Sequence, residues 1–541
     1  MTIAEYLIQQ LYDHGIRHVF GIPGDYSLAF IDELGRSPIT FVNTCDEQGA
    51  GFAADAYARL GGLGAVCVTY AVGSLKVANA AAQAYAERSP LVVLCGSPGL
   101  QERVRHPLLH HRVNQYDTQM EIFRHLTVAS AALHEPETAL AEIDRVLHAA
   151  MRHQRPVYLE LPRDQVHVPG LAGHIHEDDE ERSDPEALVE ALQEATAMLI
   201  SARQPVIIGG VEVKRFGLQP ALVRFAEQVQ IPIAVTMQGK SLVRDTFPLY
   251  LGLYAGAIGA EDVTHYVEDS DCVLVFGTPL TDISLGMFTA RLDHDRMIVA
   301  SMEGISIRHH SYDAHLGHFL AGMLEADIPR KTPQQVPRPA SAEPFTPQAA
   351  QPITTRRLFQ RLAAAIDEDT IILADIGDAL FGALDLPTLG EVRFIASADY
   401  SNMGFAIPGS LGAQLQNRAL RPLVLAGDGS FQMTGMEIST AARYGLSPII
   451  IVLNNHGYAT ERFFLDGPFN EILGWDYSRL PQVLGAGQGY LVETEEQLDA
   501  ALRAAAADPS TPALLDVRLA RGDVSDCLKK LGERMGKTVH G

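Results

Sequence analysis

Two polar segments that end apolar runs carry the residues with the clearest chemistry. Gly427-Asp428-Gly429-Ser430 follows an apolar run from Leu423, and Asn454-Asn455 follows another from Ile449. Such abrupt ends are typical of buried parallel strands at the edge where α/β sheets bind ligands. There, Asp428 and Asn455 can converge on one hard cation, which prefers oxygen donors. The glycines and Ser430 let the backbone approach a diphosphate beside a helix N-terminus, so we predict a site for a metal ion and a diphosphate.

The residues between these two segments predict a helix, which would make the flanking strands parallel. Met436 to Tyr444 contains few helix breakers, Gly445 stands where a C-cap glycine belongs, and Pro448 follows. With a helix as the connection, both polar ends emerge at the same edge of the sheet. A glycine-rich loop alone is also typical of dinucleotide sites, but the paired asparagines after the next strand make the signal specific.

Three groups in the first part of the chain add titratable side chains. Asp25 lies in a Pro-Gly-Asp turn, Glu47 separates an expected strand over 39–43 from a helix of small residues, and His110-His111 follows two leucines. Taken alone, each has an ordinary interpretation: an Asx turn for Asp25, a helix cap for Glu47 and structural loop residues for the histidines. Their chemistry becomes informative only in combination with the metal and diphosphate segment.

Length and composition limit the classes of protein to which the chain can belong. Its 541 residues are 47% apolar, enough for several buried cores. The net charge of −24 disfavours nucleic acid and anionic membrane surfaces as partners. The 5 cysteines show no metal-ligand spacing and indicate a reduced, cytoplasmic protein. Because no apolar run approaches the roughly 20 residues of a membrane span, we expect a soluble protein with no membrane partner.

Two polar, turn-rich stretches predict linkers at 168–183 and 329–352. They leave three parts, for which we expect domains over 1–167, 184–326 and 353–541. Each part alternates continuous apolar runs with helical stretches, the pattern of parallel sheets covered by helices on both faces. The predicted fold class is therefore α/β, with three doubly wound domains and mainly parallel sheets.

Together these residues resemble the thiamin diphosphate-dependent 2-oxo acid decarboxylases, the group of pyruvate, indolepyruvate and phenylpyruvate decarboxylases. The match runs nearly end to end and includes Gly-Asp-Gly followed at the family's spacing by Asn-Asn. Asn402-Met403-Gly resembles the segment that supports the bent cofactor, and Glu461 matches a further active-site acid. The resemblance implies thiamin diphosphate and Mg²⁺ as cofactors, bound between an N-terminal pyrimidine domain and a C-terminal diphosphate domain.

The resemblance also implies roles for individual residues. Glu47 would hydrogen-bond the aminopyrimidine ring and favour its imino tautomer, and Met403 would press the two cofactor rings together. The residues implied in proton transfer and carboxylate binding are Asp25, His110, His111 and Glu461. The expected cofactor contacts are Glu47, Thr69, Gly377, Asp378, Met403, Gly427, Asp428, Gly429, Ser430, Asn455, Gly457 and Tyr458. The expected metal ligands are Asp428, Asn455 and Gly457. Since the first domain of one subunit faces the third domain of another in this family, a homodimer or homotetramer is implied.

The size of the substrate is predicted from positions where pyruvate-specific relatives carry aromatic side chains. Ile283 and Leu380 align with two of them and leave space for a phenyl, indolyl or branched group. Ile376 and Thr460 would line the same cavity, with Asp282 nearby. We therefore expect a small-molecule substrate such as phenylpyruvate or indolepyruvate. Two alternatives stay open: a pyruvate decarboxylase whose pocket repacks, and a carboligase of the acetolactate synthase type with a flavin in the middle domain.

Overall fold

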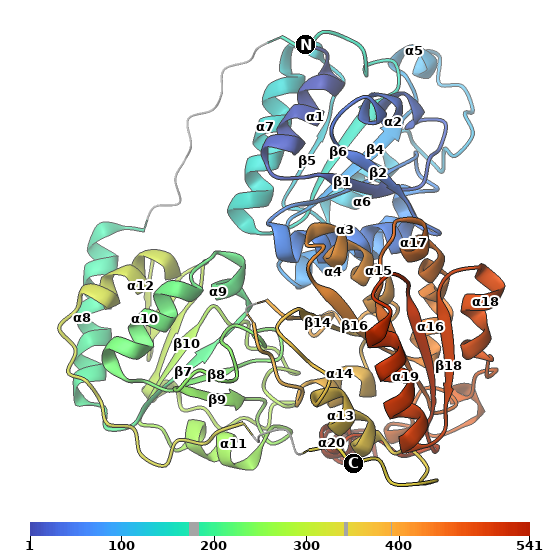
Figure 1. Ribbon diagram of the computed structural model, residues 1–541. Helices are drawn as coiled ribbons and strands as arrows, with labels where there is room; N and C mark the ends of the chain where they lie inside the picture. Colours follow the sequence, from blue (N-terminus) through green and yellow to red (C-terminus); the bar gives the residue numbers. More distant parts are fainter. Residues whose placement is uncertain (172–182, 340–343, 391, 541) are drawn as a thin grey trace.

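The computed structural model describes residues 1–171, 183–339, 344–390 and 392–540, and shows three α/β bodies (Figure 1). Each is built around one sheet with helices on both faces, which confirms the predicted fold class. Most of the first expected linker, 172–182, lies outside the described residues. The described parts of the second, 329–339 and 344–352, contain no helix or strand apart from an isolated β-bridge between Pro352 and Thr494.

The first sheet is fully parallel, in the order β2-β1-β3-β4-β6-β5. Its inner strands β3, β4 and β6 are buried at every residue, as continuous apolar runs predict. Its strands are β1 (His18–Gly21), β2 (Thr40–Asn43), β3 (Gly64–Val68), β4 (Leu91–Ser97), β5 (Ala129–Ala132) and β6 (Val157–Pro162). Its helices are α1 (Ile3–Asp13), α2 (Leu28–Gly35), α3 (Glu47–Gly61), α4 (Ser74–Ala86), α5 (Leu100–Arg103), α6 (Thr118–Arg124) and α7 (Pro136–His153).

The middle sheet is parallel from β9 to β11 and ends in two antiparallel strands, in the order β13-β12-β11-β10-β7-β8-β9. Its strands are β7 (Pro205–Gly209), β8 (Ile233–Val235), β9 (Tyr250–Leu253), β10 (Cys272–Phe276), β11 (Met297–Ala300), β12 (Ile305–Ile307) and β13 (His310–Tyr312). Its helices are α8 (Pro185–Ser201), α9 (Val211–Arg215), α10 (Gln219–Val229), α11 (Glu261–Glu268) and α12 (Leu316–Glu325).

The third sheet is fully parallel, in the order β15-β14-β16-β17-β19-β18, and so repeats the strand order of the first sheet. Its strands are β14 (Thr370–Ala374), β15 (Phe394–Ala396), β16 (Arg421–Gly427), β17 (Ile449–Asn454), β18 (Gln488–Val492) and β19 (Ala513–Arg518). Its helices are α13 (Thr355–Ala363), α14 (Asp378–Ala383), α15 (Ala406–Gln416), α16 (Asp428–Thr434), α17 (Ile438–Arg443), α18 (Leu480–Leu484), α19 (Glu495–Ala507) and α20 (Asp526–His540).

Strands β16 and β17 pair in parallel with Gly427 opposite Leu453, so the polar segments that follow them emerge at one edge of the sheet, as predicted. The connection differs from the single helix expected over 436–444. Helix α16 begins already at Asp428, and the chain then passes through a short 3₁₀ turn into α17. Gly435 marks this break, because a Cβ there would lie 2.3 Å from the Phe431 ring. Gly445 has the positive φ of +61° expected after the last turn.

Helices α3 and α15 lie against each other and join the first and third bodies (Figure 1). Small residues permit the close approach: a Cβ on Gly412 would lie 1.8 Å from the Ala53 carbonyl oxygen. The buried Arg59 guanidinium reinforces the contact by donating to the Ala396 carbonyl at 2.7 Å. Among the described residues, no helix combines the length and apolar character needed to cross a bilayer.

Candidate active site

A cavity of about 220 Å³ opens where β14, β16 and β17 end, at the edge predicted to hold the metal ion and the diphosphate. Its lining includes most of the residues expected there: Ile376, Gly377, Asp378, Met403, Gly427, Asp428, Gly429, Ser430, Asn455, Gly457, Tyr458, Thr460 and Glu461. Four further lining residues were not expected from the sequence: Ala379, Ser401, Leu453 and Ala459. Ala379, Leu453 and Ala459 are apolar, and the Ser401 hydroxyl donates to the Asp399 carbonyl at 3.4 Å. Only their position next to polar segments could have indicated them.

Asp428 lies at the buried end of this cavity, and its carboxylate is held by backbone groups. Its Oδ1 accepts from the Gly429 N–H at 2.8 Å, and its Oδ2 from the Gly457 N–H at 3.0 Å. Burial raises the pKa of this carboxyl above its usual value. A divalent cation relieves that cost of burial, because it favours the ionised carboxylate and binds oxygen donors. The donor set of Asp428, the Asn455 amide and the Gly457 carbonyl therefore fits a hard cation.

The glycines around Asp428 have steric reasons to be glycine. Gly457 has φ of +126°, and a Cβ there would lie 2.0 Å from the Asn470 carbonyl oxygen. A Cβ on Gly429 would lie 2.5 Å from the Tyr458 ring. Gly427 differs, since its Cβ would meet nothing within 4 Å, and it faces open space at the start of α16. A loop of accessible N–H groups beside an open space fits a diphosphate.

The segment carrying Met403 is anchored to the helix that follows the diphosphate loop. The Thr434 hydroxyl donates to the Gly404 carbonyl at 2.8 Å, and Gly404 has φ of +79°. A Cβ on Gly404 would lie 3.2 Å from the Met433 Cβ, so glycine lets the segment approach α16. This anchoring fixes Met403 in the cavity wall, where an apolar support for a bent cofactor is expected.

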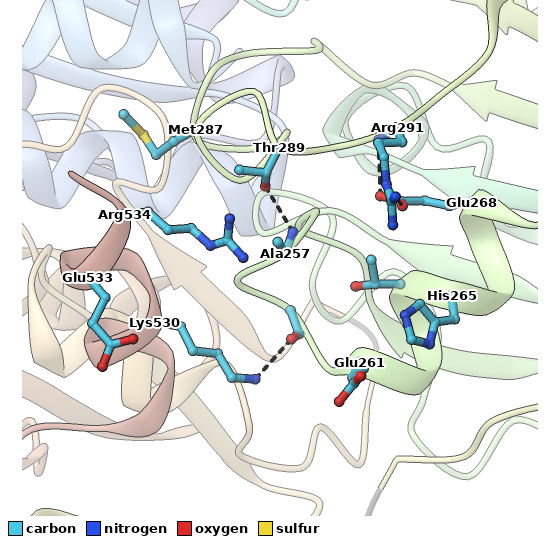
Figure 2. Close-up of a pocket in the computed structure, with 12 residues that line it drawn as sticks. Ala257, Glu261, His265, Glu268, Met287, Thr289, Arg291, Lys530, Glu533 and Arg534 are labelled. Atoms are coloured by element: carbon cyan, nitrogen blue, oxygen red, sulfur yellow. Dashed lines mark hydrogen bonds and ion pairs between the residues drawn. The ribbon is translucent and has the colours of Figure 1, made fainter. Parts of the chain in front are cut away.

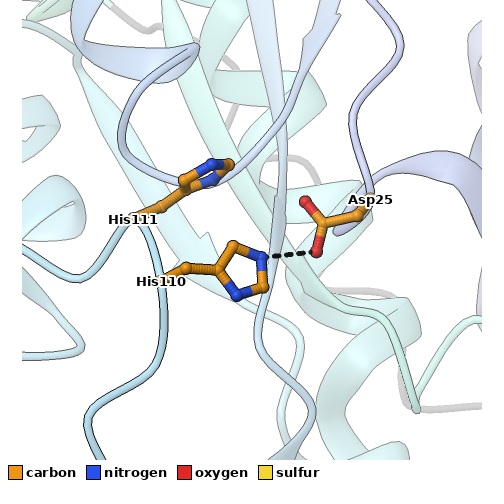
Figure 3. Close-up of side chains that lie close together, drawn as sticks. All are labelled: Asp25, His110 and His111. Carbon is orange, nitrogen blue, oxygen red and sulfur yellow. Dashed lines mark hydrogen bonds and ion pairs between the residues drawn. The ribbon is translucent and has the colours of Figure 1, made fainter.

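Asp25, His110 and His111 come together at the carboxyl edge of the first sheet (Figure 3). The His110 Nε2 lies 2.9 Å from the Asp25 Oδ2, and the two imidazole centroids are 4.8 Å apart in an edge-to-face arrangement. Tyr26 stacks on His110 with ring centroids 4.9 Å apart. His111 has φ of +64°, so its backbone is held in the left-handed region. Adjacent carboxylate and imidazole groups can hold and pass protons.

Arg163 was missed in the sequence, although it belongs to this group. Its Nη1 lies 3.5 Å from the Asp25 Oδ2, while its Nε donates to Glu102 at 2.8 Å. Its guanidinium also lies over the Tyr26 ring, 4.8 Å from the centroid. A signal for it exists in the sequence, because Arg163 directly follows the buried strand β6. In a parallel sheet, it therefore emerges at the same edge as Asp25.

Glu47 is the first residue of α3, and its side chain is 14% exposed. The Lys76 Nζ lies 2.8 Å from its Oε2 and also pairs with Asp46, a contact that no sequence pattern indicated. Thr69 lies close to the Asp25 turn, since a Cβ on Gly24 would lie 2.4 Å from the Thr69 Cβ. The Thr69 hydroxyl is buried, and no hydrogen-bond partner is found for it among the described residues. It is thus a polar group suited to a bound cofactor.

The expected cofactor and catalytic residues lie on two different domains of the chain. Every residue that lines the cavity lies between Ile376 and Glu461, so the first domain of the same chain contributes none of them. Asp25, His110, His111, Glu47 and Thr69 lie on the first domain, which Figure 1 places above the third. In a single chain, the cavity is therefore lined by the third domain alone.

Of the residues expected to contact the substrate, some line the cavity and others do not. Ile376 and Thr460 line the cavity, whereas Leu380 is fully buried in the core of the third domain and does not. Ile283 packs from the middle domain against that same core. Asp282 is exposed, and its Oδ1 accepts from the Ile283 N–H at 2.9 Å. The structure therefore places Leu380 in the core and not at the cavity surface that it was expected to shape.

A larger cavity, of about 720 Å³, lies between α11 and α20 (Figure 2). Its walls mix acidic and basic side chains. The Lys530 Nζ donates to the Gly259 carbonyl at 3.2 Å, and Arg291 pairs with Glu268 at 3.1 Å. None of the expected site residues lines it. Because acidic and basic side chains are mixed in its walls, this cavity favours neither anions nor cations. Its larger size is therefore no reason to assign the reaction to it.

Comparison with known proteins agrees with this geometry. Residues 1–122 match the thiamine pyrophosphate enzyme N-terminal TPP binding domain, 192–319 the central domain and 375–517 the C-terminal TPP binding domain. An indole-3-pyruvate decarboxylase of Azospirillum brasilense is 36% identical over 98% of this chain and 97% of its own. An alpha-keto-acid decarboxylase of Mycolicibacterium paratuberculosis is 33% identical (98% and 96% covered), and a probable pyruvate decarboxylase of Schizosaccharomyces pombe 29% (100% and 96%). The chain belongs to the thiamine pyrophosphate enzymes, among the thiamin diphosphate-dependent 2-oxo acid decarboxylases.

Proposed function

We propose that this enzyme converts a large aryl or branched 2-oxo acid, such as indolepyruvate or phenylpyruvate, into the aldehyde and CO2 without oxidation. The observation that carries the proposal is the 2.9 Å contact between Asp25 and His110, with His111 beside it. It brings proton-transfer groups from distant segments to the edge of the first sheet. The similarity to an indole-3-pyruvate decarboxylase supports the substrate class.

The third domain holds the cofactor and its metal ion in this proposal. Bound thiamin diphosphate supplies the electron sink that decarboxylation of a 2-oxo acid requires. Asp428, Asn455 and the Gly457 carbonyl would hold Mg²⁺, which would offset the negative charge of the diphosphate. Backbone groups of the loop 427–430, with Gly377, Asp378 and Tyr458 in the surrounding wall, hold the diphosphate itself. Met403, in the cavity wall, would support the cofactor rings.

The first domain supplies the groups that handle protons. Glu47 would hydrogen-bond the aminopyrimidine ring and favour its imino tautomer. Asp25, His110 and His111, together with Glu461 from the third domain, orient the substrate carboxylate and deliver the proton that completes the aldehyde. The wall also has an apolar part, formed by Ile376 and Leu453. Loss of CO2 removes negative charge from the carboxylate, so an apolar wall favours the transition state over the bound substrate.

The substrate side chain is accommodated beside Ile376 and Thr460. Both line the cavity, and neither carries the bulk of an aromatic ring. Leu380 acts through Ile376, which packs against the core that contains it, and Ile283 closes the same region from the middle domain. Asp282, the exposed acid next to Ile283, is the charged residue on that segment.

The active form is a homodimer or homotetramer with each site between two subunits. The restriction of the cavity walls to the third domain supports this arrangement, because Glu47 and the Asp25 group then come from the partner. All 5 cysteines are free thiols, in keeping with a reduced, cytoplasmic compartment.

A panel of 2-oxo acids tests the proposal directly. We expect CO2 and aldehyde release from phenylpyruvate and indolepyruvate, dependent on thiamin diphosphate and Mg²⁺, at a higher kcat/KM than from pyruvate. A higher value for pyruvate would overturn the substrate class. Formation of acetolactate by a yellow, flavin-containing protein would instead identify a carboligase and overturn the reaction.

A further inference from the structure

We propose that Asp25, His110 and His111 form a second metal site, which takes a transition metal such as Zn²⁺ or Co²⁺, and that filling it stops turnover. One donor atom from each of the three residues lies within 4.8 Å of the other two. The three form the one group of this kind among the described residues. This site is separate from the Mg²⁺ site at the diphosphate, and it binds a different ion.

The donors decide which ion binds. Two imidazole nitrogens and one carboxylate oxygen suit zinc and its neighbours in the first transition row, which bind such donors at about 2.0–2.2 Å. The Asp428 site offers oxygen donors only, which suit Mg²⁺. Saturating Mg²⁺ therefore leaves the His110 and His111 nitrogens free for a softer ion.

The geometry requires little rearrangement. Tetrahedral donors around zinc are about 3.4 Å apart, a spacing that follows from these bond lengths. The Asp25 Oδ2 and His110 Nε2 are already 2.9 Å apart, so an ion can enter by spreading that pair slightly. The His110 side chain is 59% exposed, so an ion can reach its Nε2 from solvent. His111 completes the site, and its backbone at φ +64° already projects it beside His110.

His111 also has an unused donor. Its Nδ1 is buried, and no hydrogen-bond partner is found for it in the described part of the chain. An imidazole nitrogen without a hydrogen-bond partner can bind a metal ion without breaking an existing hydrogen bond. A nitrogen that already donates to a carbonyl must break that hydrogen bond first. Since rotation of a ring presents either nitrogen, His111 can contribute a ligand without breaking an existing contact at Nδ1.

The positive charge of Arg163 repels a cation at this site but does not prevent it from binding. Its Nη1 is 3.5 Å from the Asp25 Oδ2, yet its closest partner is Glu102. With Glu102 and Asp25 each negative and Arg163 positive, the immediate surroundings retain one net negative charge. A dication is therefore attracted to the site, and the Asp25 carboxylate keeps an oxygen available for it.

The inhibitory part of the inference rests on the proposed function. A metal-bound imidazole has lost the lone pair with which it would take up a proton. Asp25, His110 and His111 would then be unable to handle the proton that completes the aldehyde. Binding itself needs only the arrangement of the three side chains.

Cobalt absorption tests the binding. The holoenzyme with saturating Mg²⁺ and thiamin diphosphate is titrated with Co²⁺, whose four-coordinate complexes absorb visible light much more strongly than six-coordinate ones. We expect an intense visible band that saturates at one ion per chain and is bleached by Zn²⁺. His111→Gln and Asp25→Asn should each lose the band.

His106→Gln is the matched control. His106 lies in the same loop, is exposed and stacks on Tyr116 at 6.3 Å, outside the three proposed ligands. This variant should keep both the band and the inhibition by Zn²⁺, with activity restored by a zinc chelator. Absence of the band in the wild type, or its persistence in both His111→Gln and Asp25→Asn, would overturn the site. A band without any decarboxylation would leave the site standing and remove the proposed function instead.

Discussion

Lys76 holds the Glu47 carboxylate, with its Nζ 2.8 Å from the Glu47 Oε2 at the start of α3. Hydrogen bonds to Asp46 and then Glu47 raise the pKa of the Lys76 ammonium, so the cation persists at neutral pH. Glu47 is also the residue assigned to the aminopyrimidine ring, so the ion pair with Lys76 competes with that hydrogen bond.

Lys76→Met removes this competition and should tighten cofactor binding. The pair is partly exposed, and such ion pairs contribute about 1 kcal/mol or less, which corresponds to a change of at most about fivefold in affinity. The measurement is the dissociation constant of thiamin diphosphate at fixed Mg²⁺, with Lys529→Met as an exposed control. Weaker binding in Lys76→Met would mean that the lysine positions Glu47 instead of restraining it.

The edge of the third sheet that carries the diphosphate loop could be predicted because the residues that indicate it are close together in the sequence. Strands β16 and β17 end abruptly in Asp428 and Asn455, and parallel pairing is enough to bring those ends together. The position of Arg163 directly after β6 indicates the edge that carries Asp25, but its pairing with Glu102 could not be predicted in the same way. The pairing of Lys76 with Glu47 could not be predicted either, because these partners lie far apart in sequence and only the packed fold places the ends of such flexible side chains.

The interior of the third domain shows a second limit. A single helix was expected between the two strands, but the Phe431 ring occupies the space beside Gly435 and the chain turns there. Leu380 was expected at the cavity surface and lies in the core behind it. Helical periodicity and alignment indicate an element and its neighbourhood, whereas packing against the rest of the domain decides which side chain reaches the surface.

A mixture of two inactive variants should regain activity if each site lies between two subunits. Glu47→Gln removes the proton donor of the first domain, and Asp428→Asn removes a metal ligand of the third, so each variant alone should be nearly inactive. In a mixed dimer, one site combines the intact first domain of one chain with the intact third domain of the other. Equal mixing with subunit exchange should restore up to about a quarter of wild-type kcat.

The readout is decarboxylation after the two chains are unfolded and refolded together, compared with the same treatment of each alone. Circular dichroism of each variant checks that the fold survives. Activity no greater than the sum of the separate variants would place both walls of the site in one chain.

Ile376→Phe should shift the preference toward small 2-oxo acids. Ile376 lines the cavity, and an aromatic ring there would fill space that we assign to the substrate side chain. A change in side-chain volume such as that from isoleucine to phenylalanine in an apolar pocket changes kcat/KM by about tenfold or more. We expect kcat/KM to fall for phenylpyruvate and to be kept for pyruvate, with Ile376→Val as the control that leaves the pocket open. Equal losses for both substrates would indicate damage to the cofactor site, since Gly377 is adjacent.

Asp375 should make the enzyme less stable as the pH rises toward neutrality. The side chain is 0% exposed; its Oδ1 accepts from the Ala406 N–H at 2.9 Å, while no partner is found for Oδ2 among the described residues. Burial raises its pKa from the usual 3.8 to about 7, although backbone N–H groups oppose the shift. The folded state therefore keeps a proton that the unfolded chain releases. The stability contributed by this group is complete below pH 3.8 and is lost as the pH rises to about 7.

Asp375→Asn isolates this contribution, because asparagine keeps the acceptor for Ala406 and cannot ionise. A difference of about three pKa units corresponds to roughly 4 kcal/mol as an upper limit. From pH 5 to pH 8, the melting temperature of wild type should therefore fall relative to that of Asp375→Asn. Asp13→Asn, an exposed change on α1, should follow wild type throughout. Parallel curves for wild type and Asp375→Asn would show that Asp375 keeps the same protonation state across this range, and that its buried carboxyl is balanced by its surroundings.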